Sequence, residues 1–352
     1  MQGRTRLTDV AEQAGVSTAT VSRVLNGKPG VAGETRRAVL AALDMLGYER
    51  PDKLRGARSA GLVGLIVPEL SNPVFPAFAQ AIESMLSTEG FTPLLCTQSP
   101  GGTTEDEYVE MLLEHDVDGI VFVSGLHADT RADVSRYERL RERGLPFVLV
   151  NGHNRAVDAP SFSTDDHASM ELAVRHLASQ GHRRIGLAIG PDRFVPARLK
   201  REGFLEAMDR YLGEPDPPVV TTMFTVEGGQ SAGSALVDAG CTAVVCGSDL
   251  MALGVVRAAR SRGLQVPADL SVVGYDDSVL IPFTSPPLTT LRQSVTAMCQ
   301  AAVTTLLAEI GGAPVPRSDL LFVPELIVRG STAAAPDAPH GAAARGEDAV
   351  RS

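Results

Sequence analysis

From Leu62 onward, short apolar runs alternate with longer segments in which apolar residues recur at helical spacing. Continuous apolar runs are typical of strands buried on both faces of a sheet. Strand–helix alternation predicts βαβ units and parallel sheets. Eight such units are too many for one open sheet, so we expect two halves that divide near residues 160–165. The runs are LVGLIV, TPLLC, GIVFVS, PFVLV, IGLAI, VVTTM, TAVVC and SVVGY, and the helical segments span about 75–89, 104–115, 131–143, 166–180, 197–212, 228–239 and 250–262.

Residues 8–30 have a different pattern, which predicts two short helices joined by a tight turn. Thr8 is a suitable N-cap for the first helix, Gly15 ends it, and Ser17 caps the second helix. Helical spacing places Val10, Ala11 and Ala14 of the first helix, and Val21, Val24 and Leu25 of the second, on the inner side.

The outer face of the second helix is small and polar, and it consists of Thr18, Ala19, Ser22 and Arg23. Two helices joined by a glycine-containing turn form a helix-turn-helix. Small side chains let such a helix enter a major groove, where hydroxyls, a methyl and a guanidinium meet base edges. An ordinary helical hairpin has the same local pattern, so the rest of the sequence must decide between the two.

The remaining segments complete the predicted organisation. A third helix is expected over about residues 34–46, and the polar, basic stretch 48–61 is expected to be a linker. The last strand-like segment, 320–328, precedes an Ala-, Pro- and Gly-rich stretch from Ser331, which we expect to be disordered.

Charge is distributed unevenly along the chain. The formal net charge is −10, yet residues 1–60 carry ten Lys or Arg and six Asp or Glu, a local net of +4. The remainder carries a net of −14. A basic head on an acidic body is typical of a DNA-binding module fused to a domain that does not bind DNA.

Enzyme and metal signatures are missing from the sequence. We find no P-loop, no G-x-G-x-x-G after a strand, no H-E-x-x-H and no G-x-S-x-G. The four cysteines have neither metal-ligand nor disulfide-framework spacing, which suits a reducing cytosol. His182, in GHRRIG, is expected to be structural. No secretory signal or apolar run long enough for a bilayer is visible, so we expect a cytoplasmic protein without catalytic activity, cofactor or metal.

Several motifs in order resemble the LacI/GalR family of bacterial repressors. The first part of the chain carries TDVAEQAGVSTATVSRVLNG, then Thr35-Arg36 and Leu46-Gly47-Tyr48, as in the DNA-binding head of that family. Asn72-Pro73 and the segments LASQGHRRIG, SDLMALGVVRAARSRGLQVPADLSVVGYDD and PPLTTLRQ resemble its effector-binding core. The resemblance covers about residues 7–329.

This resemblance implies an α/β fold: a two-lobed core of parallel sheets flanked by helices, akin to periplasmic binding proteins, with an N-terminal all-α helix-turn-helix head. Three crossovers near 161–164, 289–292 and 321–324 join the lobes. The implied parts are a head (1–47), a hinge (48–61), a core (62–330) and a tail (331–352). Within the core, lobe 1 spans about 62–162 and 290–322, and lobe 2 about 164–288 and 324–330. The ligand is expected between the lobes, outside the carboxyl ends of the strands.

By the family pattern, Thr18, Ala19 and Arg23 contact base edges. Phosphate contacts are implied for Thr8, Thr20, Ser22 and Asn26, although Thr20 and Asn26 equally suit capping or packing roles. The linker departs from the family's Asn-x-x-Ala-x-x-Leu hinge, because here it contains PDKLRGAR. Leu54 is the available minor-groove wedge, or alternatively packs on the core, and Arg55 contacts phosphate in either case.

The resemblance also assigns polar groups at strand ends to a small ligand. Phe75 and Phe162 are the candidate stacking surfaces, with core packing as the alternative for Phe75. Where family members place Arg, this chain has Lys200. Either the contact with the ligand therefore differs, or Arg198 or Arg201 makes that contact instead. The assigned effector residues are Phe75, Ser124, Asn151, Phe162, Lys200, Ser248 and Asp276.

The expected function is a ligand-responsive repressor of carbohydrate-metabolism genes. Its implied partners are a pseudo-palindromic double-stranded operator, a sugar or sugar derivative, and a second copy of the chain, with no membrane. The alternative is a sugar-binding carrier or sensor that does not act on DNA. The sequence does not identify the effector, whether it induces or corepresses, or the operator.

Overall fold

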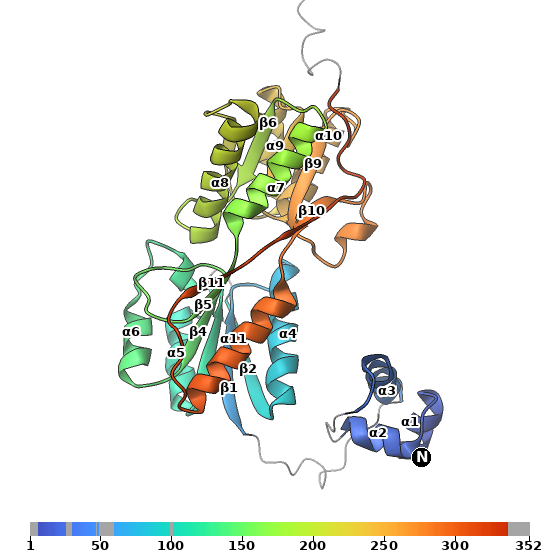
Figure 1. Ribbon diagram of the computed structural model, residues 1–352, viewed down its shortest axis with the longest axis vertical. Coiled ribbons are helices and arrows are strands. Elements are labelled where there is room, and N and C mark those ends of the chain that lie inside the picture. Colours follow the sequence, from blue (N-terminus) through green and yellow to red (C-terminus); the bar gives the residue numbers. More distant parts are fainter. Residues whose placement is uncertain (1–5, 26–29, 47, 49–59, 99–100, 337–352) are drawn as a thin grey trace, which may run out of the picture. The chain divides into compact units, whose positions relative to one another are not determined.

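A computed structural model describes residues 6–25, 30–46, 48, 60–98 and 101–336 (Figure 1). Contacts divide the chain into two compact units. One comprises residues 1–60 with 88–91, and the other comprises 61–87 with 92–352.

The N-terminal unit contains helices α1 (Leu7–Gln13), α2 (Thr18–Leu25) and α3 (Gly33–Met45). Ser17 caps α2 by accepting a hydrogen bond from the Thr20 amide at 3.1 Å. Thr8 does not cap α1, contrary to expectation, because the helix begins at Leu7 and Thr8 lies within its first turn; Arg6 is at the N-cap position, and its amide donates a hydrogen bond to Asp9. The three helices enclose a small core of Val10, Ala11, Val21, Val24, Val39 and Ala42.

The first lobe of the core is built on a six-stranded sheet in the order β11-β5-β4-β3-β1-β2. Pairing from β1 through β3, β4 and β5 to β11 is parallel. Its strands are β1 (Gly61–Val67), β2 (Phe91–Thr97), β3 (Gly119–Val123), β4 (Phe147–Val150), β5 (Ser161–Thr164) and β11 (Asp319–Phe322), and its helices are α4 (Val74–Thr88), α5 (Glu105–Glu114), α6 (Ser135–Glu142) and α11 (Val295–Ile310), with the short η2 (Leu126–Ala128).

The second lobe repeats this plan with the strand order β12-β10-β9-β8-β6-β7. Its neighbouring strands pair in parallel, except β10 and β12, which are antiparallel. The strands are β6 (Ile185–Ile189), β7 (Val219–Thr221), β8 (Ala243–Cys246), β9 (Ser271–Asp276), β10 (Thr289–Arg292) and β12 (Glu325–Ile327), and the helices are α7 (Asp166–Ser179), α8 (Val195–Leu212), α9 (Val226–Asp238) and α10 (Asp249–Ser261), with η3 (Ile281–Phe283). The expected two-lobed α/β architecture is therefore confirmed.

The chain passes between the lobes three times, from β5 to α7, from β10 to α11 and from β11 to β12. Because of the second passage, α11 packs on β3 and β4 of the first sheet, where Figure 1 draws it in orange-red beside blue and teal strands. Strand β10, whose last residues were expected in the first lobe, pairs with β9 in the second. Helix α11 was absent from the expected elements.

The segment after Arg329 is folded onto the second lobe, so the expectation of disorder from Ser331 is wrong for residues 331–336. The Ser331 hydroxyl donates to the Val272 carbonyl at 2.6 Å and accepts from the Thr289 amide. Ala333 bonds Ser271 through its amide, and its carbonyl lies 3.1 Å from Nε2 of buried His182. Composition indicated disorder, but polar side chains of the lobe bind this backbone. His182 has the expected structural role.

Candidate nucleic-acid interface and ligand site

One face of helix α2 is exposed and polar. Thr18, Ala19 and Arg23 are exposed, whereas Val21 and Val24 on the opposite face are buried in the core of the unit. The structure thus places the three expected base-contacting residues together on the outer surface of one helix. A hydroxyl, a methyl and a guanidinium at helical spacing match the chemistry of base edges in a major groove.

The residues that were expected to contact phosphate differ in their exposure and in their hydrogen bonds. The hydroxyl of Thr20 hydrogen-bonds to Ser17 at 2.9 Å, which fits the capping alternative. Thr8 is exposed on α1, with its hydroxyl 3.3 Å from Asp9. Ser22 is half-buried. Asn26, Leu54 and Arg55 lie outside the described residues, so their assignments remain predictions.

In the first lobe, two expected ligand residues end adjacent strands. Ser124 follows β3 and Asn151 follows β4, with φ values of +46° and +59°. Left-handed backbone is uncommon outside glycine and turns each strand sharply at its end. The Ser124 amide donates to Val150 and the Asn151 amide to Phe162, so the sheet ladder fixes both positions.

The two aromatic candidates differ in burial. Phe162 lies within β5 and is 4% exposed, paired in register with Val150 and Leu320. Phe75 is half-buried near the start of α4. Their assignment as stacking surfaces remains a prediction.

In the second lobe, Lys200 is already held by the protein. Its ammonium lies 2.7 Å from the Asp166 carboxylate and 3.9 Å from the centre of the Tyr275 ring. The Tyr275 hydroxyl donates to the same Asp166 oxygen at 2.8 Å. Burial raises the pKa of Asp166, while Lys200 acts in the opposite direction. The sequence indicated Lys200 as a ligand contact but gave no signal that Asp166 is its ion-pair partner.

Asp276 ends β9 and joins a hydrogen-bonded chain that runs into the first lobe. Gln293 donates to Asp276 at 2.7 Å and accepts from Thr164 at 3.0 Å. Burial and the neighbouring Asp249 carboxylate raise the pKa of Asp276 well above its ordinary value. The junction of the lobes therefore contains a buried carboxylate that Gln293 connects to Thr164 of the first lobe.

Ser248 has a capping role: its hydroxyl accepts a hydrogen bond from the Met251 amide at the start of α10. The neighbouring Asp249 accepts hydrogen bonds from Ser278 and Thr290, and burial raises its pKa to about 6. Asp277, which follows β9, pairs with Arg292 and Arg329.

A cavity of about 1010 Å³ lies between the α4 side of the first lobe and the ends of β9 and β10. Among the residues predicted to bind ligand, Asp276 is the one that lines it within the described part of the chain. Gln293, which holds Asp276, lies beside it. Its other lining residues include Pro73, Val74, Pro76, Ala77, Gln80, Ser278, Arg292 and Ser294.

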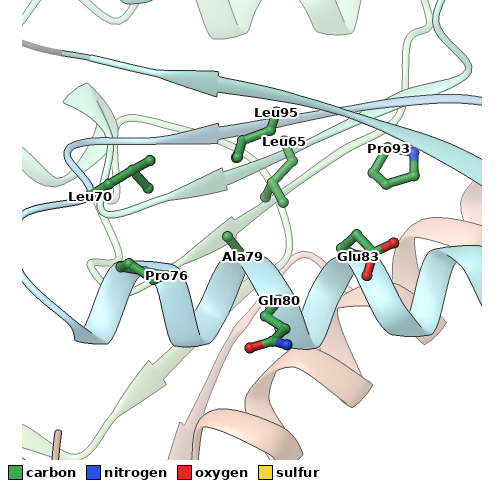
Figure 2. Close-up of a pocket in the computed structure, with 8 residues that line it drawn as sticks. All are labelled: Leu65, Leu70, Pro76, Ala79, Gln80, Glu83, Pro93 and Leu95. Carbon is green, nitrogen blue, oxygen red and sulfur yellow. The ribbon is translucent and has the colours of Figure 1, made fainter. Parts of the chain in front are cut away.

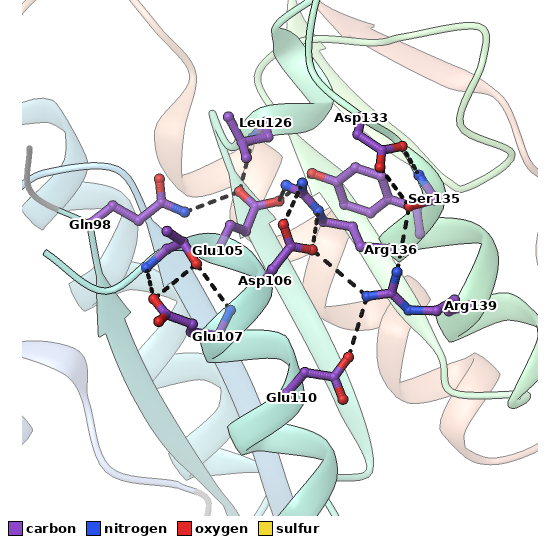
Figure 3. A network of polar contacts seen from close by, with 12 residues as sticks. Gln98, Glu105, Asp106, Glu107, Glu110, Leu126, Asp133, Ser135, Arg136 and Arg139 are labelled. Atoms are coloured by element: carbon purple, nitrogen blue, oxygen red, sulfur yellow. Dashed lines mark hydrogen bonds and ion pairs between the residues drawn. The ribbon is translucent and has the colours of Figure 1, made fainter. Parts of the chain in front are cut away.

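A buried ionic network, which the sequence analysis missed, fixes the loop after β3 (Figure 3). The Glu105 carboxylate accepts hydrogen bonds from the Leu126 amide at 2.9 Å, Tyr137 at 2.5 Å, Arg136 at 3.2 Å and Gln98 at 3.2 Å. The side chains of Glu105 and Arg136 are 0% and 5% exposed. The network therefore holds the backbone that follows Ser124.

His127, in the same loop, gives a pH-dependent prediction. Burial lowers its pKa to about 4, against a smaller raising effect of Glu105. The folded state therefore disfavours the imidazolium. The contribution of neutral His127 to the free energy of unfolding is complete above pH 6.5 and is lost as the pH falls toward 4. This shift corresponds to about 3 kcal/mol in the free energy of unfolding.

Urea unfolding of wild type and His127→Gln between pH 7.5 and 4 measures this contribution. We expect the variant to have the shallower loss of stability with falling pH. The same substitution at the exposed His115 controls for the removal of a histidine. Identical pH dependence in wild type and His127→Gln would contradict the assignment.

Within the described residues, no three His, Cys, Asp or Glu side chains are grouped so that they could bind a metal ion. No helix in the described part of the chain is both long and apolar enough to cross a membrane.

Comparison with known proteins extends these observations. Residues 6–51 match the model of bacterial regulatory proteins of the lacI family, and residues 174–332 match a periplasmic binding protein-like domain. The transcriptional regulators reg1 of Streptomyces lividans and MalR of Streptomyces coelicolor are each 63% identical to the chain, covering 94% of it and 98% of the relative.

Solved structures give the same result. The chain is similar to the transcriptional regulator CelR in complex with cellobiose, with a TM-score of 0.67 and 30% identity over 93% of this chain and 100% of that one. It is also similar to the lac repressor dimer bound to operator and the anti-inducer ONPF, with a TM-score of 0.68 and 28% identity over 94% and 100%. The chain therefore belongs to the LacI family of bacterial transcriptional regulators.

Proposed function

We propose that the protein is a homodimeric repressor whose affinity for a pseudo-palindromic operator changes when a sugar binds between the lobes of its core. The observation that carries the proposal is the exposed Thr18–Ala19–Arg23 face of α2 in a chain that also contains a two-lobed core. The head weighs against the alternative of a carrier that does not act on DNA, since a carrier needs no groove-reading helix.

The proposal assigns the ligand to the junction of the lobes. Ser124 and Asn151 end strands of one lobe, and Asp276 ends a strand of the other. Carboxylate and amide groups suit the hydroxyls of a sugar. The similar structure of CelR with bound cellobiose supports a carbohydrate. Coupling is reciprocal, so operator changes sugar affinity by the same factor as sugar changes operator affinity.

A mobility-shift titration tests this function. The full chain is titrated onto DNA from upstream of its own gene, with and without a panel of sugars that includes cellobiose and ribose. We expect retardation at low salt and a change in operator affinity with at least one sugar. Sugar binding without retardation of any DNA would favour the carrier.

Two exposed apolar surfaces of the core support the homodimer. The first is a groove of about 360 Å³ between α4 and the β2 edge of the first sheet, lined by Leu70, Pro76 and Leu95 among others (Figure 2). The second is the segment around η3, where Val279, Leu280 and Phe283 are exposed. Exposed apolar patches mark association surfaces, and a palindromic site needs two heads.

Phe283→Arg is expected to weaken dimerisation. The ring is 84% exposed in the single chain, and an arginine at the centre of an apolar interface costs about 2 kcal/mol or more. Sedimentation velocity at micromolar concentration should show a shift toward monomer, with operator affinity reduced in parallel. Met223→Arg, at another exposed apolar side chain, is the control. If the Phe283→Arg protein remained as dimeric as this control, η3 would not be part of the dimer interface.

We further propose that the protein is cytoplasmic and has no catalytic activity. Membership of a family of transcriptional regulators supports both statements.

A further inference from the structure

Backbone pairing joins the two lobes at a place where the chain does not cross between them. Asp129 and Thr130 follow η2 in the first lobe, whereas Arg193 and Phe194 precede α8 in the second. Asp129 and Phe194 form an antiparallel bridge. The Arg193 carbonyl accepts hydrogen bonds from the Thr130 amide at 2.8 Å and from the Thr130 hydroxyl at 3.0 Å. These four residues, which we call the interlobe latch, bind the backbone of one lobe directly to that of the other.

An ion pair reinforces the interlobe latch. Nε of Arg193 lies 3.4 Å from Oδ2 of Asp129, and the two side chains are 45% and 9% exposed. The guanidinium also lies 4.7 Å from the centre of the Phe194 ring, which restricts its direction. The other oxygen of Asp129 accepts a hydrogen bond from the Arg131 amide at 3.0 Å. The carboxylate is therefore held in its own turn and directed at the arginine of the other lobe.

Each side of the interlobe latch is anchored in its own lobe. The buried Glu105 carboxylate accepts a hydrogen bond from the first amide of η2 at 2.9 Å (Figure 3). Phe194 occupies the N-cap position of α8 and packs against the core of the second lobe. A Cβ atom on Gly152 would lie 2.5 Å from Cβ of Ala128 and 3.5 Å from Cδ of Pro196, so the lobes approach too closely there for another side chain. The latch thus connects two rigid bodies.

The interlobe latch is displaced from the crossings that connect the lobes. In the first sheet the chain crosses from β5 and β11, whereas the latch follows β3, two strands away from β5. In the second sheet the crossing strands are β10 and β12, and the latch follows β6, three strands away from β10. Neighbouring strands are about 4.8 Å apart, which places the latch about 10–14 Å from the crossings. A rotation of one lobe about the crossings must therefore break the latch.

We propose that Asp129, Thr130 and Arg193 form a latch that stabilises the closed arrangement of the lobes and must open before a ligand enters or leaves their junction. The latch residues lie on the loop that begins at Ser124, so this loop both ends a strand at the junction and binds the opposite lobe. A few non-covalent bonds suit such a device, because a closed and an open arrangement then differ by a small free energy. The gating of a ligand rests on the sugar-responsive function proposed above, whereas the stabilisation of the closed lobes does not.

Hydrogen exchange of the full chain without sugar tests the interlobe latch directly. The Thr130 amide is bonded across the lobes, so its exchange with solvent requires the latch to open. Arg193→Ala removes the ion pair and leaves the accepting carbonyl in place. In overlapping peptides that resolve Thr130, we expect exchange about three- to fivefold faster than in wild type, the range for one partly exposed ion pair.

Arg198→Ala is the matched control. Arg198 also lies 3.4 Å from its partner Glu202 with an exposure similar to that of Arg193, but both members of that pair belong to α8. Its exchange should equal that of wild type. Asp129→Asn is a second latch variant, since it removes the negative charge and keeps an oxygen for the Arg131 amide. Exchange of this amide that is unchanged in both latch variants overturns the proposal.

The release of a bound sugar tests the gating role. The full-length protein is loaded with radiolabelled cellobiose, or with the sugar of the panel that changes operator binding, and is chased with unlabelled sugar during rapid filtration. Because release requires the interlobe latch to open, its rate constant should be about three- to fivefold higher in Arg193→Ala than in wild type. Arg198→Ala should release sugar at the wild-type rate. Equal rates in wild type and Arg193→Ala overturn the gating role.

The outcomes separate this proposal from the proposed function. If the latch variants exchange faster but no sugar binds, the carbohydrate function is overturned and the interlobe latch stands as the contact that holds the lobes closed. If a sugar binds and changes operator affinity while Arg193→Ala and Asp129→Asn behave as Arg198→Ala in both measurements, the repressor function stands and the interlobe latch is overturned.

Discussion

Replacing Arg23 by alanine is expected to weaken operator binding by about 2–6 kcal/mol. One specific contact between an arginine and a base is worth about 1–3 kcal/mol, and a dimer on a palindromic site loses it twice. Arg23 is exposed on α2 beside Ala19, and the opposite face of the helix is buried. The loss should come with relaxed specificity at one symmetric pair of operator positions.

Fluorescence anisotropy on a set of operators, each with one base-pair change, measures both effects. Arg23→Lys is the informative companion, since it keeps the positive charge but cannot form the planar two-pronged contact of arginine. We expect it to keep most of the salt dependence of wild type while losing specificity. If Arg23→Ala lost affinity equally on every operator variant and kept the wild-type preferences, Arg23 would be a phosphate contact and the proposed groove contact would be wrong.

Replacing Glu105 by alanine is expected to lower the free energy of unfolding by about 3–5 kcal/mol. The substitution leaves the buried guanidinium of Arg136 without its Glu105 partner, and removing one member of a buried ion pair costs that much. The Tyr137 hydroxyl and the Leu126 amide lose their acceptor as well. Arg136 keeps its bonds to Asp106, so the loss should lie toward the lower end of the range.

Denaturant unfolding of the full chain measures this difference. Glu110→Ala is the matched control, because Glu110 lies on the same helix and pairs with Arg139 at 3.3 Å where both side chains are about half-exposed. Exposed pairs contribute about 0–1 kcal/mol. Equal destabilisation by the two substitutions would show that the Glu105 network has no special role in the fold.

The strands that are clearest in the sequence are those whose residues are apolar throughout. β3, β4 and β8 are buried along their whole length, so parallel pairing with helices on both faces leaves a continuous apolar run. The first two helices of the head were equally predictable, because Ser17, Gly15 and the spacing of Val21 and Val24 are local signals. These features depend on neighbours in sequence, and one sequence is enough to find them.

Elements at the lobe crossings were harder to predict. β5 (SFST) and β10 (TTLR) are short and contain hydroxyl-bearing residues, so no apolar run marks them. They are strands because neighbouring strands supply their hydrogen bonds. Helix α11 has few charged residues, so the sequence shows no clear alternation between an apolar and a polar face. Ser331 and Thr332 belong to the folded lobe because distant groups bind them: the Thr289 amide donates to the Ser331 hydroxyl, and His176 hydrogen-bonds to the Thr332 hydroxyl.

The sequence by itself determined the family, the two-lobed α/β core, the DNA-reading face of α2 and the strand ends where a ligand is expected. Only the tertiary structure decided which charges are already matched: Lys200 by Asp166, Asp277 by Arg292 and Arg329, and Glu105 by Arg136. The physical reason is the range of the interactions. Helix caps and apolar periodicity act within one turn or strand, whereas an ion pair depends on the distance between side chains that separate elements bring together.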